Sequence, residues 1–502
     1  MTAFILVAGA YTGGWVWQEL AARLRESGAE VHPATLTGLG DRRHLAGPGT
    51  DLETHIQDLV GLIDHVDTQD VVIAGHDYGI HPVLGAADRR PDRIGRIVHL
   101  DTGVPRDGEP ALGLVPDQKL RELLLDEAEA AGADWRISVP APEDWQRWGS
   151  TAGIPDDALA RLTRLAAPHP RGALRQPLRL TGVTAQLPTT GVLCTKNGSS
   201  IAAIEAFAGL GDPRSKMLVE RRVTFFELDT GHWPMLSAPD ELATVLLKAA
   251  AGDGYRLAPA AGERPAHLRP FLLDVPKRPR ERVGHLDLYL PEAEGPRPAV
   301  VFVHGGPVPA GVAPTPRDWP AFIGYGRYVA SRGAVGVTLD HRLHDLTDFE
   351  RAAEDVAAAV ERVRADPRVD PDRVALWFFS AGGLISTDWI AAPPPWLRCV
   401  AVSYPVLAPL PNWGLADTRF RPVAALRTAG ALPIVLTQVG RERAEIAATV
   451  QQFLTAAATH ERNIEVIDVP EGLHGFETTE PTEETRRAAH DSVRSVLDHL
   501  MD

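Results

Sequence analysis

Two residues with nucleophilic side chains each follow a short apolar run and lie close to a glycine. Asp77 lies in GHDYG, after VVIA at residues 71–74, and Ser380 lies in FFSAG, after VALW at residues 374–377. A sharp turn between a strand and a helix, with small residues beside it, exposes such a side chain at the end of the strand. The pattern predicts a carboxylate nucleophile in the first half and a hydroxyl nucleophile in the second.

A histidine follows each nucleophile further along the chain. His232 lies in DTGHW after the run VTFFEL, and His474 lies in EGLHGF after the run IEVIDV. Histidine can take up and return a proton near neutral pH, so each can serve as the base for its half.

The apolar runs before these residues occur in the same order in both halves of the chain. Short apolar runs at 4–7, 71–74 and 223–228 recur in the second half at 299–303, 374–379 and 464–469, and amphipathic stretches such as 51–66 and 349–364 lie between them. Continuous apolar runs of this length are typical of buried parallel strands covered by helices. Each half therefore reads as an α/β domain with a doubly wound, mostly parallel sheet.

The two halves differ in length between nucleophile and histidine. We expect a first domain at 1–251, a linker at 252–264 that is rich in Ala, Gly and Pro, and a second domain at 265–502 that opens with an antiparallel pair from 271–276 and 283–292. The extra length of the first half, about 105–188, predicts a cap with helices at 117–131 and 156–166. The second site should be more open.

Composition excludes several classes of function. The 502 residues carry a formal net charge of −15, which disfavours nucleic acid and anionic membranes as partners. The two cysteines, Cys194 and Cys399, predict buried free thiols, and no metal-ligand spacing appears. We expect a cytoplasmic protein without cofactor or metal that acts on a small molecule. The basic run at 277–282 predicts a solvated turn.

The first half resembles the α/β-hydrolase superfamily, in particular a bacterial and plant group of capped small esterases. The resemblance rests on VAGAYTGGWVW, TLTGLGDRRHL, LETHIQDLVGLI, HLDTGVP and TGHWPMLSAPDELA. Two departures stand out: Asp77 replaces the serine of that group, and Ala8-Gly9 replaces His-Gly. An aspartate at this position is similar to epoxide hydrolases and haloalkane dehalogenases.

This resemblance implies chemistry at a saturated carbon. A carboxylate can open an epoxide or expel a halide and form an alkyl ester, which water activated by His232 then hydrolyses. The resembled esterases place an aspartate where this chain has Asn197. Asp101, after the run IVHL, either orients His232 or only caps a turn. The glycine-rich loop and the residue after the nucleophile would bind the oxyanion or substrate, a set comprising Gly9, Ala10, Tyr11 and Tyr78.

The second half resembles carboxylesterases and dienelactone-hydrolase-like members of the same superfamily. The resemblance implies that Gly305 and Gly306, after His304, form the oxyanion loop together with Ala381, and that Glu442 orients His474. Phe378 departs from this pattern, because a small residue is expected two positions before the serine. A bulky side chain there would push the helix from the strand or strain the turn.

The leading hypothesis is a hydrolase of small organic molecules, with an epoxide-hydrolase-like first half and an esterase-like or lactonase-like second half. Two alternatives stay open. The first half could catalyse a lyase or cyclase step with Asp77 as the base, or the second half could be a scaffold or binding domain. The two halves could also pair with each other as a homodimer would, and homo-oligomerisation is left open.

Overall fold

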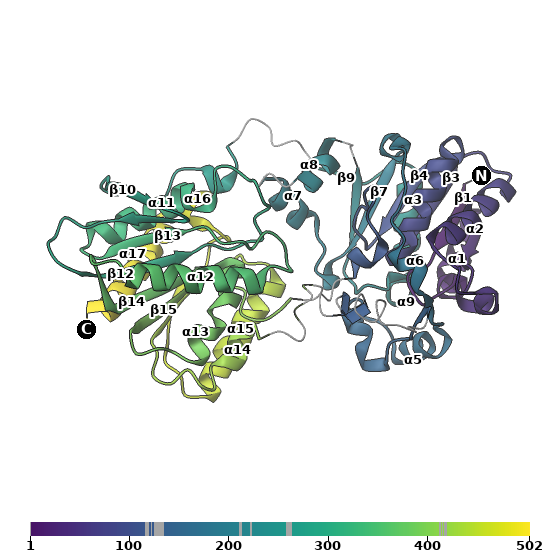
Figure 1. The fold of residues 1–502 in the computed structure, drawn as a ribbon. Coiled ribbons are helices and arrows are strands. Elements are labelled where there is room, and N and C mark those ends of the chain that lie inside the picture. The colour runs from purple at the N-terminus through teal and green to yellow at the C-terminus, as the bar shows by residue number, and fades with distance from the viewer. Residues whose placement is uncertain are drawn as a thin grey trace. The chain divides into compact units, whose positions relative to one another are not determined.

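The chain folds into two compact units, one built mainly from residues up to 259 and the other mainly from residues after it (Figure 1). The computed structural model describes residues 2–115, 120–121, 123–124, 135–209, 213–220, 223–257, 264–410, 413, 415 and 419–501. Each unit contains a large sheet with helices packed on it, which confirms the predicted α/β class.

The sheet of the first unit has the strand order β2-β1-β3-β4-β7-β8-β9, and all neighbours are parallel except β8 and β9. Its strands are β1 (Ala3–Val7), β2 (Glu30–Ala34), β3 (Val71–His76), β4 (Ile94–Leu100), β7 (Thr189–Cys194), β8 (Thr224–Leu228) and β9 (Tyr255–Arg256). The α-helices outside the cap are α1 (Gln18–Glu26), α2 (Leu52–His65), α3 (Ile80–Arg89), α7 (Ile201–Gly209), α8 (Pro213–Glu220), α9 (Pro234–Ser237) and α10 (Pro239–Ala250).

Local sequence explains why these elements form. Every residue of β1 and β3 is buried, as expected for central strands covered on both faces. Helix α2 begins at a capping box, in which the Asp51 side chain accepts from the Thr54 N–H and the Thr54 hydroxyl interacts with the Asp51 N–H. Its buried residues include Ile56, Leu59 and Ile63, at helical spacing along one face.

The long segment between β4 and β7 is the part of the first unit that the sequence predicts to be a cap. It contains a two-stranded ribbon and short helices: β5 (Arg136–Ile137), β6 (His169–Pro170), α5 (Asp156–Leu165), α6 (Arg171–Arg175), and the 3-10 turns η5 (Ala111–Leu114), η6 (Pro142–Arg147) and η7 (Val183–Gln186). Helix α5 matches the helix predicted at 156–166. The helix predicted at 117–131 lies largely outside the described residues.

The sheet of the second unit has the order β10-β11-β13-β12-β14-β15-β16-β17 and is parallel from β13 onward. Its strands are β10 (Arg280–Val283), β11 (Leu286–Tyr289), β12 (Arg297–Val303), β13 (Val335–Leu339), β14 (Val369–Phe379), β15 (Leu397–Ser403), β16 (Ile434–Val439) and β17 (Ile464–Val469). Its α-helices are α11 (Pro320–Ser331), α12 (Phe349–Arg364), α13 (Thr387–Ala391), α14 (Pro422–Ala425), α15 (Ala444–Thr459), α16 (Phe476–Thr479) and α17 (Glu483–Met501).

The antiparallel pair that opens this unit differs from the prediction. Its first strand is β10, which comes from the basic run expected to be a solvated turn, and not residues 271–276. Gly284, with a φ of 61°, lies in the tight turn to β11. Residues 271–276 instead bury Leu272 and Leu273 against the hydrophobic core. The prediction for 271–276 is wrong because a short apolar run indicates burial and does not by itself distinguish a strand from other buried segments.

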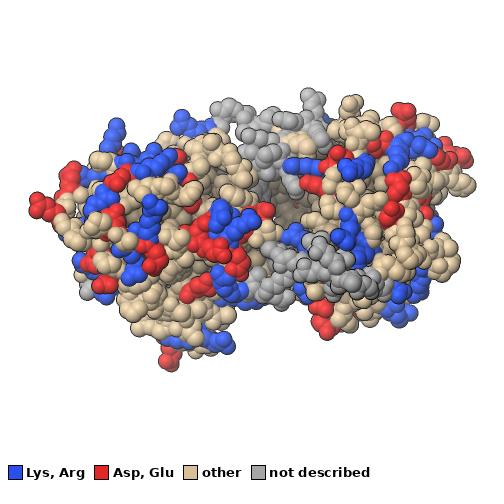
Figure 2. Space-filling model, in the orientation of Figure 1, with Lys and Arg blue, Asp and Glu red and all other residues tan. Residues whose placement is uncertain are grey.

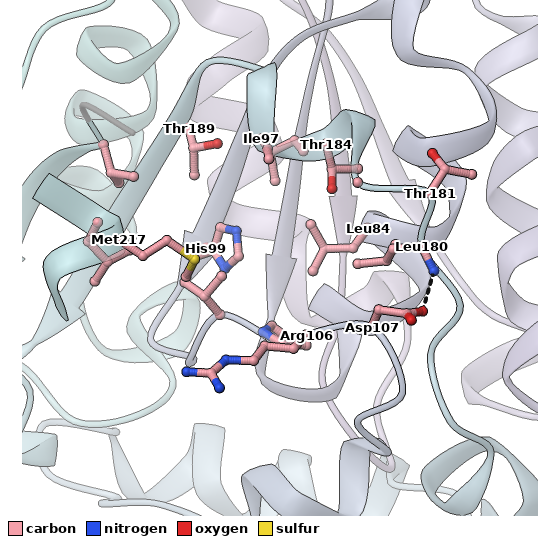
Figure 3. Close-up of a pocket in the computed structure, with 16 residues that line it drawn as sticks. Leu84, Ile97, His99, Arg106, Asp107, Leu180, Thr181, Thr184, Thr189 and Met217 are labelled. Carbon is pink, nitrogen blue, oxygen red and sulfur yellow. Dashed lines mark hydrogen bonds between the residues drawn. The ribbon is translucent and has the colours of Figure 1, made fainter. Parts of the chain in front are cut away.

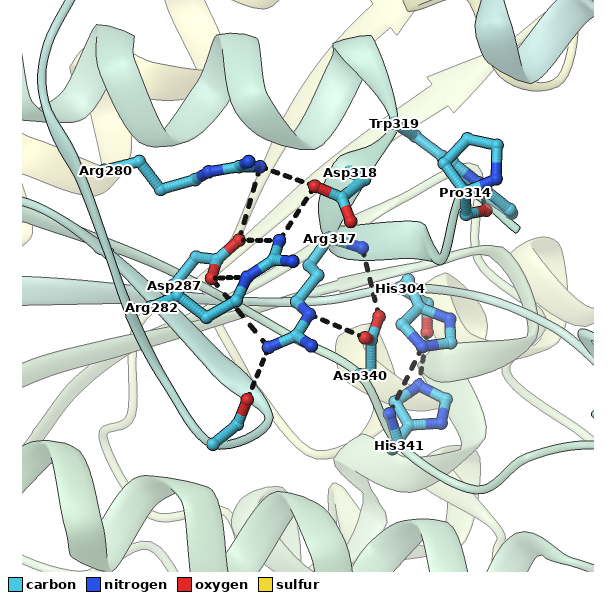
Figure 4. Close-up of polar contacts among 11 residues, drawn as sticks. Arg280, Arg282, Asp287, His304, Pro314, Arg317, Asp318, Trp319, Asp340 and His341 are labelled. Carbon is cyan, nitrogen blue, oxygen red and sulfur yellow. Dashed lines mark hydrogen bonds and ion pairs between the residues drawn. The ribbon is translucent and has the colours of Figure 1, made fainter. Parts of the chain in front are cut away.

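The arginines of β10 surround a carboxylate that is withdrawn from solvent. Asp287 on β11 has a fully buried side chain and accepts two 2.8 Å hydrogen bonds from Arg282. Figure 4 shows Arg280, Arg282 and Arg317 converging on it, and Asp318 accepting from the first two. The network joins the edge hairpin to the 3-10 turn η10 (Pro316–Asp318).

The acidic side chains do not gather into one patch on the face that Figure 2 draws. On the face drawn in Figure 2, basic and acidic side chains are interspersed. Within the described ranges, no helix has both the length and the hydropathy needed to cross a membrane. Cys194 and Cys399 are buried free thiols, as predicted.

Asp287→Asn should destabilise the second unit by about 2 kcal/mol, because a neutral amide that cannot accept both hydrogen bonds of Arg282 replaces the buried carboxylate. Asp318→Asn is the matched control: this side chain is 26% exposed, so a loss below about 1 kcal/mol is expected. Urea unfolding of both variants measures the difference. An equal loss of unfolding free energy in both variants would show that the buried Asp287 stabilises the network no more than Asp318 does.

Candidate active sites

Asp77 stands on a sharp turn at the carboxyl end of β3. Its φ is 48°, in the left-handed region that few non-glycine residues adopt. The glycines on both sides permit the turn: a Cβ on Gly75 would lie 2.6 Å from Ile80 Cα, and one on Gly79 would lie 2.7 Å from the Ala8 carbonyl oxygen. The GHDYG sequence therefore brings the start of α3 against the sheet and leaves Asp77 at the end of the strand.

The structure brings His232 together with Asp101. His232 Nδ1 lies 2.7 Å from Asp101 Oδ2, and both side chains are almost fully buried. Asp101 Oδ1 accepts from the Cys194 N–H at 3.0 Å, and Asn197 Nδ2 donates to Asp101 Oδ2 at 2.5 Å. The amide orientation of Asn197 is fixed, because its Oδ1 accepts from the Ser150 N–H at 2.7 Å. Asp101 thus contacts the histidine, and Asn197 binds Asp101.

The electrostatics of this site favour a protonated His232. Burial by itself lowers its pKa, but the hydrogen bond and charge of Asp101, together with the charge of Asp77, outweigh it and raise the pKa above 6.5. The neighbouring His76 behaves oppositely. Burial and the proximity of His232 lower the pKa of His76 to about 4, and its Nε2 lies 2.7 Å from the His232 carbonyl oxygen, to which the neutral ring can donate.

The glycine-rich loop after β1 approaches Asp77 closely. A Cβ on Gly9 would lie 2.8 Å from Asp77 Cβ, and the Ala10 N–H donates to Asp77 Oδ2 at 3.1 Å. The Tyr11 N–H is engaged elsewhere, because it donates to Nδ1 of the buried His169 at 3.2 Å. Of the two loop amides after Gly9, that of Ala10 therefore faces the carboxylate, and that of Tyr11 ties the loop to the cap.

The two tyrosines predicted to line the first site are both buried. The Tyr78 hydroxyl lies 2.6 Å from His55 Nδ1, and His55 Nε2 in turn lies 2.7 Å from the Thr37 carbonyl oxygen. The phenol therefore bonds within the core, which leaves only the backbone of Tyr78 for the predicted cradle. The Tyr11 ring packs edge-on against Trp145 and Trp148 of the cap. His169, to which the sequence assigned no role, fixes this loop from the cap.

Cap residues also hold the backbone around His232. The His232 N–H donates to the Ser150 carbonyl oxygen at 2.7 Å, and the Gly231 N–H donates to that of Ala152 at 3.0 Å. A Cβ on Gly149 would lie 2.4 Å from His232 Cγ, so only glycine lets the cap approach this closely. The imidazole is consequently only 6% exposed.

In the second unit, three side chains form a continuous chain of hydrogen bonds. Ser380 follows β14 with a φ of 52°, and its Oγ lies 2.8 Å from His474 Nε2. His474 Nδ1 lies 2.6 Å from Glu442 Oε2. This is the geometry of a nucleophile, a base and an orienting acid. The imidazole of His474 is 34% exposed, far more than that of His232, which agrees with the predicted difference in openness.

Phe378 does not prevent the turn at Ser380. It is fully buried and keeps its register in the sheet, opposite Val303 and Val402. The chain that follows differs from the first unit, since a seven-residue 3-10 helix, η11 (Ser380–Ser386), precedes α13, whereas only η3 (Asp77–Gly79) precedes α3. The longer 3-10 segment accompanies the larger side chain at this position.

The loop after β12 also lies against its nucleophile. A Cβ on Gly305 would lie 2.7 Å from Ser380 Cβ, and one on Gly306 would lie 3.1 Å from Leu343 Cδ2. His304 stacks face to face on His341 with ring centroids 3.7 Å apart, as Figure 4 shows. Burial lowers the pKa of both rings, so they stack as neutral groups behind the loop.

Sequence reasoning missed two groups of the second site, Tyr404 and Glu477. Tyr404 packs its ring against the imidazole of His474, with centroids 4.7 Å apart, and its hydroxyl donates to Glu477 Oε2 at 2.9 Å. A signal was available for Tyr404, because it directly follows β15 as Asp101 directly follows β4. Glu477 follows His474 by one helical turn and gave no comparable signal.

A cavity of about 400 Å³ in the first unit is separate from these residues. It lies beside α3, β4 and α8, and Figure 3 shows His99, Arg106 and Met217 lining it. None of the predicted site residues lines this cavity. Over the described part of the chain, no cluster of His, Cys, Asp and Glu side chains is arranged to hold a metal ion.

Comparisons of the sequence with known proteins relate the first unit to alpha/beta hydrolases and part of the second unit to the BD-FAE family. The sequence model of the alpha/beta hydrolase family matches residues 4–245, and a second family model, BD-FAE, matches residues 286–387. The carbendazim hydrolyzing esterase of Nocardioides sp. (strain SG-4G) is 31% identical over 249 residues, which is 49% of this chain and 98% of that protein.

Two further similar proteins cover different shares of the chain. A putative chloroplastic methylesterase of Arabidopsis thaliana, methylesterase 14, is 28% identical over 107 residues, which is 21% of this chain and 31% of the relative. Among solved structures, an extracellular alpha/beta-hydrolase from a Paenibacillus species is 22% identical with a TM-score of 0.41, and the match covers 50% of this chain and 99% of that one.

Asp101→Asn should lower the pKa of His232, because burial then acts without the carboxylate that opposes it. A base must be neutral to accept a proton, so any activity that uses His232 should extend to lower pH while its maximum falls. Nitrogen-15 NMR titration of the histidines measures the change.

The double variant Asp101→Asn, Asn197→Asp is the matched control. Asn197 Nδ2 lies 3.1 Å from His232 Nδ1, so a carboxylate at 197 can reach the ring, and the raised pKa should return. An unchanged pKa in Asp101→Asn would contradict the assignment of Asp101 as the partner of His232.

Proposed function

The chain belongs to the alpha/beta hydrolase family, and from this premise we propose that it hydrolyses small organic molecules at two separate sites. The second site would cleave a carboxylic ester or lactone through Ser380. The first would displace a leaving group from a saturated carbon through Asp77. The continuous chain from Ser380 through His474 to Glu442 is the observation that carries the proposal.

Ester cleavage at the second site follows from this chain of hydrogen bonds. Ser380 Oγ attacks the ester carbonyl carbon while His474 Nε2 takes its proton, and Glu442 stabilises the imidazolium that results. The alkoxide leaves with the proton from His474. Water then attacks the acyl-enzyme with His474 again as the base, which releases the acid and restores Ser380. Backbone amides of the Gly305–Gly306 loop and Ala381 would bind the oxyanion.

The first site supports a different reaction because its nucleophile is a carboxylate. An attack by Asp77 on an ester would give an anhydride, which offers little advantage over direct hydrolysis. With Oδ2 held by the Ala10 N–H, Oδ1 is placed to attack a saturated carbon and expel the leaving group, which gives an alkyl ester on Asp77. Water deprotonated by His232 attacks Cγ, and the charge that develops on Oδ2 is stabilised by the same amide. The product leaves as an alcohol that takes the proton from His232.

The amino-acid composition of the cap limits which classes of leaving group the first site can expel. Residues 105–188 contain no tyrosine, so no cap phenol can supply a proton to an epoxide oxygen. The Tyr78 hydroxyl cannot supply one either, because it is bound to His55. A leaving group that departs as a stable anion, such as a halide, fits this site better than an epoxide. The same observation also favours the second candidate, a lyase step in which Asp77 removes a proton and no alkyl ester forms.

Ser380 should react irreversibly with a fluorophosphonate, because its hydroxyl is bonded to a histidine base. Wild type should be labelled at Ser380, with loss of aryl ester hydrolysis. Ser380→Ala should lose labelling and at least about 10³-fold of that hydrolysis. Intact-mass and peptide mass spectrometry locate the label, and Asp77→Asn is the control that should behave as wild type in this assay. Full ester hydrolysis by Ser380→Ala would contradict the proposal for the second site.

Asp77 should take up one oxygen atom from water with each turnover if it is the nucleophile. In a single turnover of a haloalkane or epoxide in oxygen-18 water, the mass of the peptide carrying Asp77 should rise by one oxygen-18 substitution, since water attacks Cγ and the original oxygen leaves with the product. Ser380→Ala serves as the control and should incorporate the label equally. Turnover without incorporation into Asp77 would favour the lyase candidate over the alkyl-enzyme.

A further inference from the structure

A second carboxylate lies behind the imidazole of the second site. Glu477 belongs to the first turn of α16, three residues after His474, and is 1% exposed. Two tyrosines hold it: the Tyr404 hydroxyl donates to Oε2 and the Tyr325 hydroxyl donates to Oε1, each at 2.9 Å. Both oxygens therefore accept a hydrogen bond, which suits an ionised carboxylate.

Tyr404 connects this carboxylate to the imidazole of His474. The residue follows β15 with a φ of 36°, and its N–H donates to the Thr437 carbonyl oxygen at 2.8 Å, so its backbone is fixed by the sheet. Its hydroxyl is fixed by Glu477. The ring between these two anchors packs on His474 at 4.7 Å. The Tyr404 ring therefore packs on one side of the His474 imidazole, and the position of this ring depends on Glu477.

The burial of Glu477 carries an energetic cost. Burial raises its pKa, and only its own N–H, the two tyrosine hydroxyls and the positive charge of His474 oppose that shift. In the described ranges no ion pair joins it to a lysine or arginine. The elements packed around it carry Arg486, which donates to the Leu272 carbonyl oxygen, and His267, which stacks on Trp319. A buried carboxylate without a cationic partner, beside a histidine, is an arrangement found at functional sites.

We propose that Glu477 and Tyr404 are positioning residues for His474: Tyr404 fixes the plane of the imidazole, and the Glu477 carboxylate adds a second negative charge that favours the imidazolium. Glu442 remains the acid bonded to Nδ1. The inference rests on the proposed ester hydrolysis at Ser380, because it concerns the proton that His474 takes from that serine.

The test compares Glu477→Gln and Tyr404→Phe with Tyr328→Phe. Tyr328 lies on α11 with Tyr325, and its hydroxyl bonds to His490 instead of Glu477, so it is a matched loss of one buried phenol. The rate of Ser380 labelling by a fluorophosphonate is measured from pH 5 to pH 9. The His474 ring is titrated by NMR in the same variants, and its signal is assigned from its loss in His474→Asn.

Glu477→Gln should slow labelling at high pH by about tenfold, and both the acidic limb of the profile and the NMR titration of His474 should move to lower pH, because a negative charge is lost. Tyr404→Phe should slow labelling by about threefold with a smaller shift. The labelling rate of Tyr328→Phe should stay within about twofold of the wild-type rate. This should hold even if Tyr328→Phe lowers the thermal midpoint as much as Glu477→Gln does.

A Glu477→Gln protein with an unchanged His474 pKa and a labelling rate like that of Tyr328→Phe would overturn the proposal and leave Glu477 a structural residue. Failure of the proposed function gives a different result, since wild type would then not be labelled at Ser380. The NMR titration of His474 still decides the role of Glu477 in that case.

Discussion

Both candidate sites depend on one backbone constraint, the left-handed residue at the end of a central strand. In the described part of the chain, six non-glycine residues have a positive φ, and five of them, Tyr11, Asp77, Asp101, Ser380 and Tyr404, lie at the two sites. Each such conformation costs roughly 1–3 kcal/mol and persists only where its surroundings enforce it. Here the sheet enforces it, because the N–H groups of Asp101 and Tyr404 each donate to the neighbouring strand at 2.8 Å.

The acid that contacts the histidine follows a different strand in each of the two units. In the first unit the acid that contacts the histidine follows β4, and the corresponding place after β7 holds Asn197. In the second unit the acid, Glu442, comes after β16, and Tyr404 stands after β15 where the first unit has Asp101. The histidine can be reached from either strand end, since the two strands are neighbours in each sheet. One chain thus contains both arrangements.

The sequence was sufficient for the fold class, the turns at Asp77 and Ser380, and the pairing of Glu442 with His474. These follow from strands buried on both faces and from glycine spacing, which are local properties. It was insufficient for the edge hairpin, where apolar residues 271–276 pack in the core and the basic residues of β10 form the strand. It was also insufficient for His169 and Glu477, whose partners lie 158 and 73 residues away in the chain. Their contacts depend on tertiary packing that spacing does not encode.

The contacts of the cap with the first site have a consequence for the order of events there. The Ser150 carbonyl oxygen binds the His232 amide, its N–H binds Asn197, and His169 binds the Tyr11 amide. Displacing the cap would therefore loosen His232, the support of Asp101 and the glycine-rich loop after β1 together. In the reaction proposed for Asp77, a displaced cap and a complete site would exclude each other, so the alkyl ester would form only with these cap contacts in place.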